Sequence, residues 1–184
     1  MIAQSAAPPP PNGGPAIARL LRAAVVEALP ALRAISEDDS QRRRHPPAWS
    51  PREIIGHLID SASNNHGRFV RASIEDSLVF PPYDQEAWVA LQGYHDQAWH
   101  GLLDRWTAFN EQVAGMIERI PQAALMRQRT NHNLHRIAWR TVPDGVATSL
   151  EYFVRDYIGH LRHHLAQVAS SVDVDATVHA RQGA

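Results

Sequence analysis

Ser50-Pro-Arg-Glu-Ile-Ile-Gly-His57-Leu-Ile-Asp60 is the stretch of this sequence that most clearly indicates its fold class. Ser50 can cap a helix, Pro51 suits the first helical position, and Glu53 completes a Ser-x-x-Glu capping box. The apolar residues that follow recur at helical spacing, which predicts an amphipathic helix to about residue 73. This helix carries His57 in its second turn, next to the apolar face.

Asp156-Tyr-Ile-Gly-His160-Leu-Arg-His-His164 lies in a second amphipathic segment, which is predicted to be helical over about residues 149–170. A second capping signal, Thr148-Ser-Leu-Glu151, is expected to open it. The apolar residues of this segment recur at helical spacing and define one buried face: Leu150, Val154, Tyr157, Leu161 and Val168. His164 falls on that face, where another apolar residue is expected, and His160 lies one turn earlier.

Two further segments show the same period of apolar residues, near 16–35 and near 95–120. Pro30 lies inside the first and is expected to kink it, whereas Pro121 ends the second. The polar segment 37–44 is expected to be a loop. Segments 74–93 and 121–147 are long connections, the first with a short helix near 86–91. The sequence therefore predicts an all-α protein, a four-helix bundle with long crossover connections.

Length and composition agree with one globular domain. The chain has 184 residues, of which 44% are hydrophobic and 20% are charged. We expect the Pro- and Gly-rich residues 1–15 to be a disordered N-terminal tail. Residues 16–170 are expected to form the bundle, and residues 171–184 a C-terminal tail.

Charge and cysteine content narrow the class of partner. A formal net charge of -1 gives no overall attraction to nucleic acid or to an anionic membrane, so neither is expected as a partner. The absence of cysteine excludes disulfides and thiolate zinc sites, so a metal would be held by His, carboxylate or water. The first residues lack the pattern of a signal peptide and no apolar run reaches transmembrane length, which predicts a cytoplasmic protein.

His57, His160 and His164 are the candidate metal ligands. Two histidines four positions apart lie one above the other on a helix, so both rings can reach one ion. The spacing alone is a weak signal, because a chain with eleven histidines in 184 residues is expected to contain such a pair about as often as not. Two interpretations stay open on the pattern: a three-histidine site for a divalent ion, or two hydrogen-bonded core histidines and one surface histidine.

The motifs around these histidines resemble those of the DinB/YfiT-like family of metal-dependent enzymes. The resemblance rests on Trp49-Ser50-Pro51-x-x-Ile54-x-x-His57-Leu58-x-Asp60, on Pro82-Tyr83-Asp84-Gln85-x-x-Trp88 with Leu91-Gln92-Gly93-Tyr94, and on Asp156-Tyr157-Ile158-x-His160-Leu161-x-x-His164-Leu165. Together these stretches cover about residues 16–170. The resemblance implies a four-helix bundle and one divalent metal ion, held by His57, His160 and His164.

The resemblance also implies a small-molecule substrate and leaves the reaction open. A divalent ion with an open position could activate water for hydrolysis, or a low-molecular-weight thiol of the bacillithiol or mycothiol type for S-transfer. Zinc and nickel are the expected metals, with iron, manganese and copper as alternatives. A third interpretation is a non-catalytic helical binding module, and a homodimer formed through exposed aromatic residues would fit it.

Three residues beside the histidines are candidates for supporting or acid–base roles. Asp60 and Asp156 are expected to accept hydrogen bonds from ring N–H groups of the ligands. Tyr157 is expected to donate near the open position of the metal. Each of them has a purely structural alternative.

The positions of the histidines along their helices predict where the site lies. His57 is early in its helix and His160 is late in its own, so the two helices must run antiparallel and the site must lie toward one end of the bundle. The metal is expected at the floor of a cleft that opens toward the crossover and the long 121–147 connection. Trp88 and Tyr94 are the aromatic residues expected near its mouth.

Overall fold

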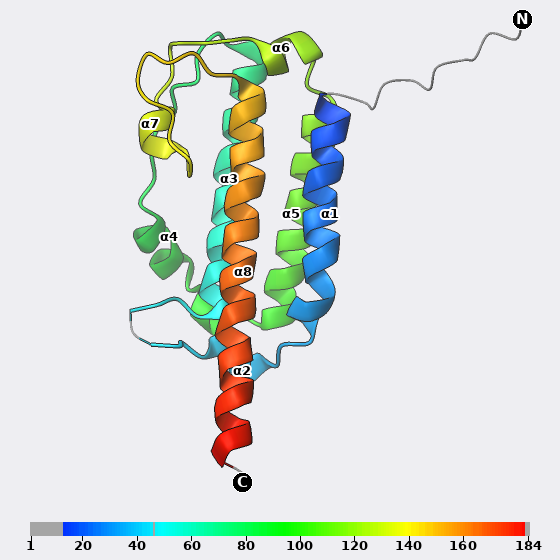
Figure 1. Ribbon diagram of the computed structural model, residues 1–184, viewed down its shortest axis with the longest axis vertical. Coiled ribbons are helices and arrows are strands. Elements are labelled where there is room, and N and C mark those ends of the chain that lie inside the picture. The colour runs from blue at the N-terminus through cyan, green and yellow to red at the C-terminus, as the bar shows by residue number, and fades with distance from the viewer. Residues whose placement is uncertain (1–12, 46, 183–184) are drawn as a thin grey trace, which may run out of the picture.

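The computed structural model of the protein describes residues 13–45 and 47–182. Four long helices form a bundle (Figure 1), namely α1 (Gly14–Arg33), α3 (Pro51–Ile74), α5 (Trp99–Glu118) and α8 (Leu150–Gln182). Within these residues, strand-like pairing is limited to two isolated bridges, Leu78 with His132 and Arg129 with Thr148. The predicted all-α four-helix bundle is confirmed.

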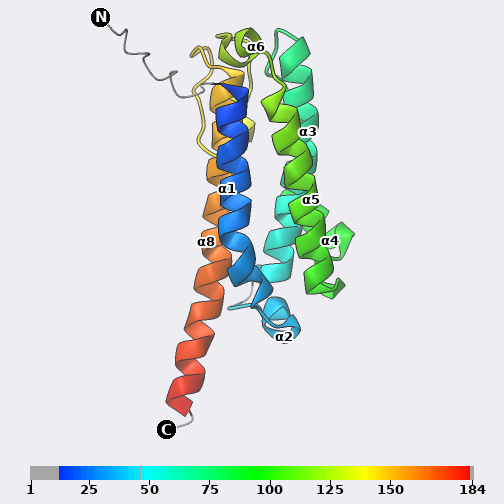
Figure 2. The same cartoon turned by 90° about the vertical axis from the view of Figure 1, so that its right-hand side faces the viewer.

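The direction of the four helices explains the long crossover. α3 and α5 run one way along the bundle and α1 and α8 run the other way (Figures 1 and 2). α1 packs beside α5 and α8, and α3 packs beside the same two helices. Because α3 and α5 are parallel neighbours, the chain between them must return along the bundle. That segment contains α4 (Gln85–Gln92) and the short 3-10 helix η1 (Tyr94–Asp96).

Large aromatic side chains fill the core between the helices. Trp99 and Trp106 of α5 and Phe69 of α3 are fully buried. The indole Nε1–H of Trp99 donates a hydrogen bond of 2.9 Å to the backbone oxygen of Leu32. This bond satisfies the polar end of a buried tryptophan and ties the end of α1 to the start of α5.

Short helices occupy segments that the sequence pattern did not predict as helical. α2 (Glu37–Gln41) replaces the expected polar loop: the Ser36 hydroxyl accepts a hydrogen bond of 3.1 Å from the backbone N–H of Asp39, and the first turn is acidic. The helices α6 (Gln122–Met126) and α7 (Leu134–Ile137) interrupt the 121–147 connection. A helix of one turn is too short to show an apolar period, so periodicity cannot detect it.

The outer boundaries of the first and last helices differ from those predicted. α1 begins at Gly14 and contains Pro30 near its end, while residues 1–12 of the predicted tail lie outside the described residues. α8 continues to Gln182, so the helix end predicted near residue 170 is wrong. Val168 is the last buried apolar residue among the side chains that the structure describes, and a helix can continue beyond the residues that it buries.

The two predicted capping boxes have different outcomes. At α3 the box is present: the Ser50 side chain accepts from the N–H of Glu53, and the Glu53 carboxylate accepts from the N–H of Ser50 at 2.8 Å. At α8 the capping residue is Ser149, whose hydroxyl accepts a bond of 3.2 Å from the N–H of Tyr152. Thr148 instead pairs with Arg129 through its backbone, which leaves the next residue to cap the helix.

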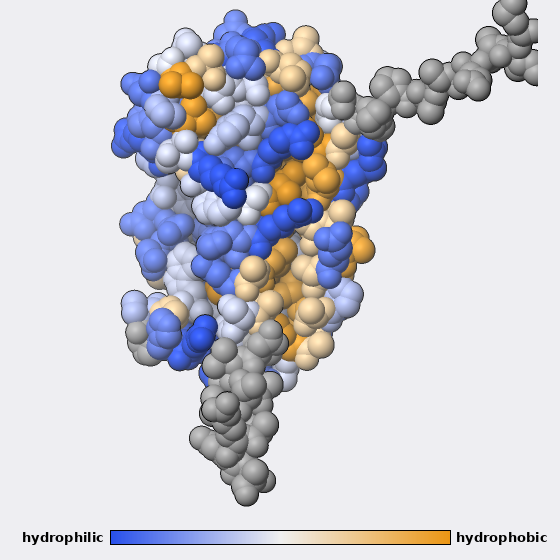
Figure 3. Space-filling model, in the orientation of Figure 1, coloured by the Kyte–Doolittle hydropathy of each residue, from blue (hydrophilic) through white to orange (hydrophobic). Residues whose placement is uncertain are grey.

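The surface is unevenly polar. On the face shown in Figure 3, hydrophilic residues dominate over α4, α7 and the segments around them, whereas apolar residues gather between α8 and α1. Leu20 and Val26 are exposed apolar residues of α1. In the part of the chain that the structure describes, no helix has an apolar stretch of the length needed to cross a membrane.

Gly56 allows the crossover to pack directly on α3. A Cβ atom at this position would lie 2.1 Å from the ring of Tyr94, so only a glycine admits the ring there. Tyr94 is itself buried, and its ring lies over the helix backbone next to His57. This close approach fixes the crossover against the first half of α3.

Replacing Gly56 with alanine should therefore destabilise the protein by about 1–3 kcal/mol, because the ring must move to make room. Gly67→Ala is the matched control on the same helix, since a Cβ there meets nothing within 4 Å. That change should stabilise the protein by up to about 1 kcal/mol, through helix propensity alone. Urea unfolding of both variants measures the difference, and equal effects would contradict the packing argument.

Candidate metal centre

Three histidine rings converge between α3 and α8. His57 extends from the second turn of α3, and His160 and His164 extend from successive turns of α8. The Nε2 atom of His160 lies 3.3 Å from Nε2 of His57 and 3.0 Å from Nε2 of His164. One ring nitrogen from each residue lies within 4.8 Å of the others. The convergence predicted from the sequence is thus present.

Hydrogen bonds among the rings cannot satisfy all three nitrogen atoms. A neutral imidazole nitrogen either donates one proton or accepts at one lone pair. His160 Nε2 faces the Nε2 atoms of both neighbours, so one of the two contacts is left without a good partner. Buried polar atoms without partners are rare in native proteins and call for an explanation such as a bound ion.

The ring of His164 is oriented by a residue that the sequence analysis did not select. Its Nδ1–H donates a hydrogen bond of 2.7 Å to Oε1 of Gln167, which leaves the Nε2 lone pair directed at the other two rings. Metal-binding histidines usually have such a partner on their second nitrogen. The i, i+3 spacing of His164 and Gln167 on one helix face is the signal that could have identified it.

Burial keeps the rings neutral. His57 is 1% exposed, and His160 and His164 are partly buried. Desolvation by burial, followed by the charge of His164, lowers the pKa of His57 from 6.5 to about 3. Desolvation and the neighbouring histidines likewise lower the pKa of His160 to about 3, and burial lowers that of His164. Neutral rings at physiological pH have the free lone pairs that a metal ion requires.

The donor set fits a divalent ion. Four-coordinate zinc with Zn–N bonds of about 2.0–2.1 Å would hold its nitrogen ligands about 3.3 Å apart. The two Nε2–Nε2 separations to His160, 3.3 and 3.0 Å, are close to this value. The second ring nitrogen of His57, the buried Nδ1, makes no hydrogen bond. The centroid of the His57 ring lies 5.1 Å from the centroid of the Trp49 ring.

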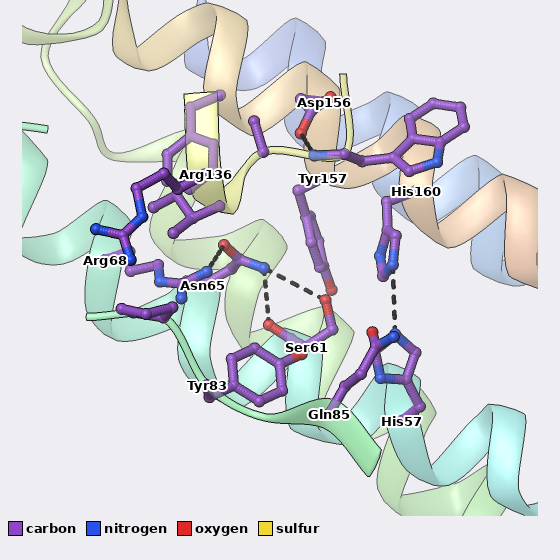
Figure 4. A pocket seen from close by; sticks show the side chains of 15 residues that line it. His57, Ser61, Asn65, Arg68, Tyr83, Gln85, Arg136, Asp156, Tyr157 and His160 are labelled. Carbon is purple, nitrogen blue, oxygen red and sulfur yellow. Dashed lines mark hydrogen bonds between the residues drawn. The ribbon is translucent and has the colours of Figure 1, made fainter. Parts of the chain in front are cut away.

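A cavity of about 260 Å³ opens beside His57 and His160. Figure 4 shows the side chains that line it, which come from four parts of the chain. They are His57, Ser61, Asn65 and Arg68 of α3; Pro82, Tyr83 and Gln85 of the crossover; Arg136, Ile137, Ala138 and Trp139 around α7; and Phe153, Asp156, Tyr157 and His160 of α8. As predicted, the crossover and the long connection form its walls.

The two aspartates have partners other than the histidine rings. Asp60 accepts a hydrogen bond of 2.7 Å from the hydroxyl of Tyr94 and one of 3.3 Å from Gln92, and thus holds the crossover. Asp156 accepts bonds of 2.8 Å from the backbone N–H groups of Trp139 and Arg140. The expected bonds to ring N–H groups are absent among the described residues, because both carboxylates anchor the walls of the cavity.

Tyr157 is also oriented away from the role expected of it. Its hydroxyl donates a bond of 2.6 Å to Oδ1 of Asn110 on α5, and the residue is 2% exposed. Burial raises its pKa well above the ordinary value of 10. Tyr157 therefore lines the cavity, while its hydroxyl is bound to Asn110 in the core and is not free to donate to a ligand of the metal.

Different aromatic residues line the cavity from those predicted. Tyr94 of the crossover is buried against α3, and Trp88 packs on the ring of Tyr83 with 5.0 Å between ring centroids. Tyr83 and Trp139 line the cavity in their place. Trp139 is held close to α8 because Gly159 has no side chain; a Cβ there would lie 2.9 Å from its ring.

A polar stripe along α3 is the main feature of the site that the sequence analysis missed. His57, Ser61, Asn65 and Arg68 follow one another at spacings of four, four and three residues, which places them on one helix face. All four line the cavity. The spacing was visible in the sequence, but nothing there indicated that this face meets a cavity rather than solvent.

The low pKa values of His57 and His160 predict how the metal-free protein responds to acid. Their pKa in the folded state is below the ordinary value of 6.5, so the unfolded chain binds protons more readily. Their contribution to stability is fully present above pH 6.5 and falls as the pH decreases toward 3. We expect stability to fall as the pH decreases through this range, by at most about 1.4 kcal/mol per pH unit for each histidine that is protonated in the unfolded chain and neutral in the folded protein.

Urea unfolding of the metal-free protein between pH 7 and 4 measures this dependence. The double variant His57→Gln, His160→Gln should show a shallower slope than the wild type. His66→Gln serves as the control, because His66 lies elsewhere on α3, against Phe109. Identical slopes in the wild type and the double variant would show that the two histidines are not buried in neutral form.

Comparisons with known proteins agree with this architecture. The family model of the DinB superfamily matches residues 20–168. The chain is 28% identical over 120 residues to "Putative metal-dependent hydrolase YfiT" of Bacillus subtilis, which covers 65% of this chain and 62% of that protein. It is 27% identical over 131 residues to "Putative metal-dependent hydrolase BH0277" of Halalkalibacterium halodurans, which covers 68% of this chain and 66% of that protein.

A solved structure shows the same arrangement of helices. YfiT from Bacillus subtilis, described as having an unusual four-helix bundle topology, superimposes with a TM-score of 0.72 over 95% of both chains. The sequence identity in this comparison is 18%, so it supports the fold alone. The aligned regions span slightly less than two thirds of the relatives YfiT and BH0277. Because the family model covers most of the chain, the protein belongs to the DinB superfamily.

Proposed function

We propose that this protein is a metal-dependent hydrolase of a small molecule, with a divalent ion held by His57, His160 and His164. The observation that carries the proposal is the convergence of three neutral Nε2 atoms beside a polar cavity. Three neutral ligands leave the charge of the ion uncompensated and leave a coordination position open, as in catalytic and not in closed structural sites. The names of the relatives YfiT and BH0277 support the same reaction class.

His57, His160 and His164 would hold the ion, which when bound would supply the chemistry that hydrolysis needs, by lowering the pKa of a water molecule. The described side chains that line the cavity offer little alternative for activating water. Asp156 carries the only carboxylate among the described residues that line the cavity, and two backbone N–H groups already bind it. Because this carboxylate is held by the backbone, activation of the nucleophile would depend on an ion held by the three histidines and not on a carboxylate side chain.

Tyr83 is the residue best placed to orient a substrate. Burial is the main cause that raises its pKa to about 12, so its hydroxyl stays protonated at physiological pH. A protonated phenol in a cavity wall can donate a hydrogen bond to a substrate oxygen. We assign Tyr83 this positioning role, with the nearby hydroxyl of Ser61 as its neighbour in the cavity.

The ligand assignment predicts that His160→Ala abolishes metal binding and leaves the helical circular dichroism almost unchanged. The bundle core does not need this imidazole, whereas the ion would lose the central one of its three ligands. His163→Ala is the control, since His163 is exposed and its ring lies against Trp139. Metal analysis of both purified variants gives the answer, and an unchanged metal content in His160→Ala would refute the assignment.

Hydrolysis and thiol transfer are distinguished by the requirement for a thiol. We expect the zinc- or nickel-loaded protein to cleave members of a panel of small esters and amides in water, with a rate proportional to metal content. The rate should fall at least about 100-fold in His57→Ala. A product that forms only with an added thiol such as bacillithiol, mycothiol or glutathione, and contains its sulfur, would favour the transferase. No turnover with either set would favour a binding module.

A further inference from the structure

Three arginine side chains are buried within the described residues, and two of them have evident partners. Arg52 forms an ion pair with Glu37. Arg129 donates hydrogen bonds to backbone carbonyl groups near the end of α3 and around α6, including one of 2.9 Å to Ala72. The ion pair compensates the charge of Arg52, and four carbonyl oxygens accept hydrogen bonds from Arg129, although its Nε atom has no partner. The third, Arg68, has neither an ion pair nor a comparable set of carbonyl acceptors among the described residues.

The guanidinium of Arg68 has only neutral and distant partners. Its Nη2 donates a hydrogen bond of 2.9 Å to the carbonyl oxygen of Pro81, and its Nη1 lies 3.4 Å from Oδ1 of Asn65. The ring of Tyr83 lies 5.8 Å from its central carbon. The residue is 7% exposed, and among the described residues it has no ion pair with a carboxylate.

Arg68 lines the cavity beside the metal centre. Figure 4 shows Arg68 and Arg136 at one end of this cavity and His57 and His160 at the other. Among the described residues, Asp156 forms no ion pair with Arg68 or Arg136; its two oxygens accept backbone hydrogen bonds from Trp139 and Arg140. The arginine end of the cavity is therefore a positively charged region formed by one buried guanidinium, Arg68, and one exposed guanidinium, Arg136.

We infer that the arginine end of the cavity binds an anionic group of the substrate, a carboxylate or a phosphate, through Arg68 with Arg136 beside it. A guanidinium offers paired N–H donors that match the oxygens of either group. The charge of Arg68, which has no carboxylate partner among the described residues, is then compensated when the substrate binds. The inference rests on the proposed function only in placing the reacting bond near the histidines; anion binding itself needs no metal.

The geometry also indicates the shape of the substrate. His57 and Arg68 are eleven residues apart on α3, which corresponds to about 16 Å along the helix axis. Ser61 and Asn65 lie between them on the same face and present polar groups to the cavity. A molecule that reaches both ends must therefore be elongated, with its anionic group several bonds from the bond that reacts and a polar section between.

The test uses metal-free protein and simple probes of equal shape. Binding of pentanoate and of the neutral pentanamide is measured by ligand-observed NMR at pH 7.5. Pentanoate should bind to the wild type at least about ten-fold more tightly than pentanamide. Competition by inorganic phosphate would extend the site to phosphate-bearing substrates, and failure to compete would restrict it to carboxylates.

Matched variants locate the binding. Arg68→Gln should weaken pentanoate binding at least about ten-fold, and Arg136→Gln by a smaller factor because Arg136 is exposed. Arg71→Gln is the control: it removes the same charge from an exposed position one turn away on α3, outside the cavity, and should leave binding unchanged. Circular dichroism and metal content equal to those of the wild type would show that Arg68→Gln remains folded.

Three results would overturn the inference: no binding of pentanoate to the wild type, equal binding of pentanamide, or equal losses in Arg71→Gln and Arg68→Gln. His160→Ala separates this inference from the proposed function, because it should lose metal and keep pentanoate binding. Metal loss in that variant without anion binding in the wild type would leave the metal centre supported and the anion site refuted.

Discussion

The antiparallel contact between α3 and α8 is the constraint on which the rest of the site depends. Aromatic residues set its register: the ring of Phe69 meets those of Phe153 and Tyr157 edge-on, at centroid distances of 5.4 and 5.8 Å. Because this aromatic contact fixes the register, the turn of α3 that carries His57 must face the two turns of α8 that carry His160 and His164. That alignment brings the three histidines together, and the cavity lies along the contact between the aromatic residues and the histidines.

The carboxylates near the site act on the walls of the cavity. Asp60 binds Tyr94 and thereby holds the crossover, and Asp156 binds the backbone at Trp139 and Arg140 and holds the segment after α7. Each aspartate is buried, and burial raises the pKa of both while their hydrogen bonds oppose the shift. Two helices thus position not only the histidines but also the two connections that enclose the space beside them.

Several polar groups of this site are unfavourable for folding alone. The His57 ring is buried without a partner on Nδ1, the three Nε2 atoms cannot all be paired, and Arg68 lies buried away from any carboxylate of the described residues. A protein selected only for stability would replace such groups with apolar side chains. These groups lie in or beside one cavity, and this gives the metal and anion proposals a common physical basis.

The sequence alone determined the four long helices, the cap of α3 and the face that carries His57, because capping and a period of 3.6 residues depend only on near neighbours. It also placed His160 and His164 on one side of a helix. Only the tertiary structure decided which residues share the cavity. Asp60 binds Tyr94, and Tyr157 binds Asn110, so neither takes the role expected beside the histidines. Arg68, Tyr83 and Trp139 line the cavity. These contacts could not be predicted, because helix register and the paths of long connections depend on packing between segments that are distant in sequence.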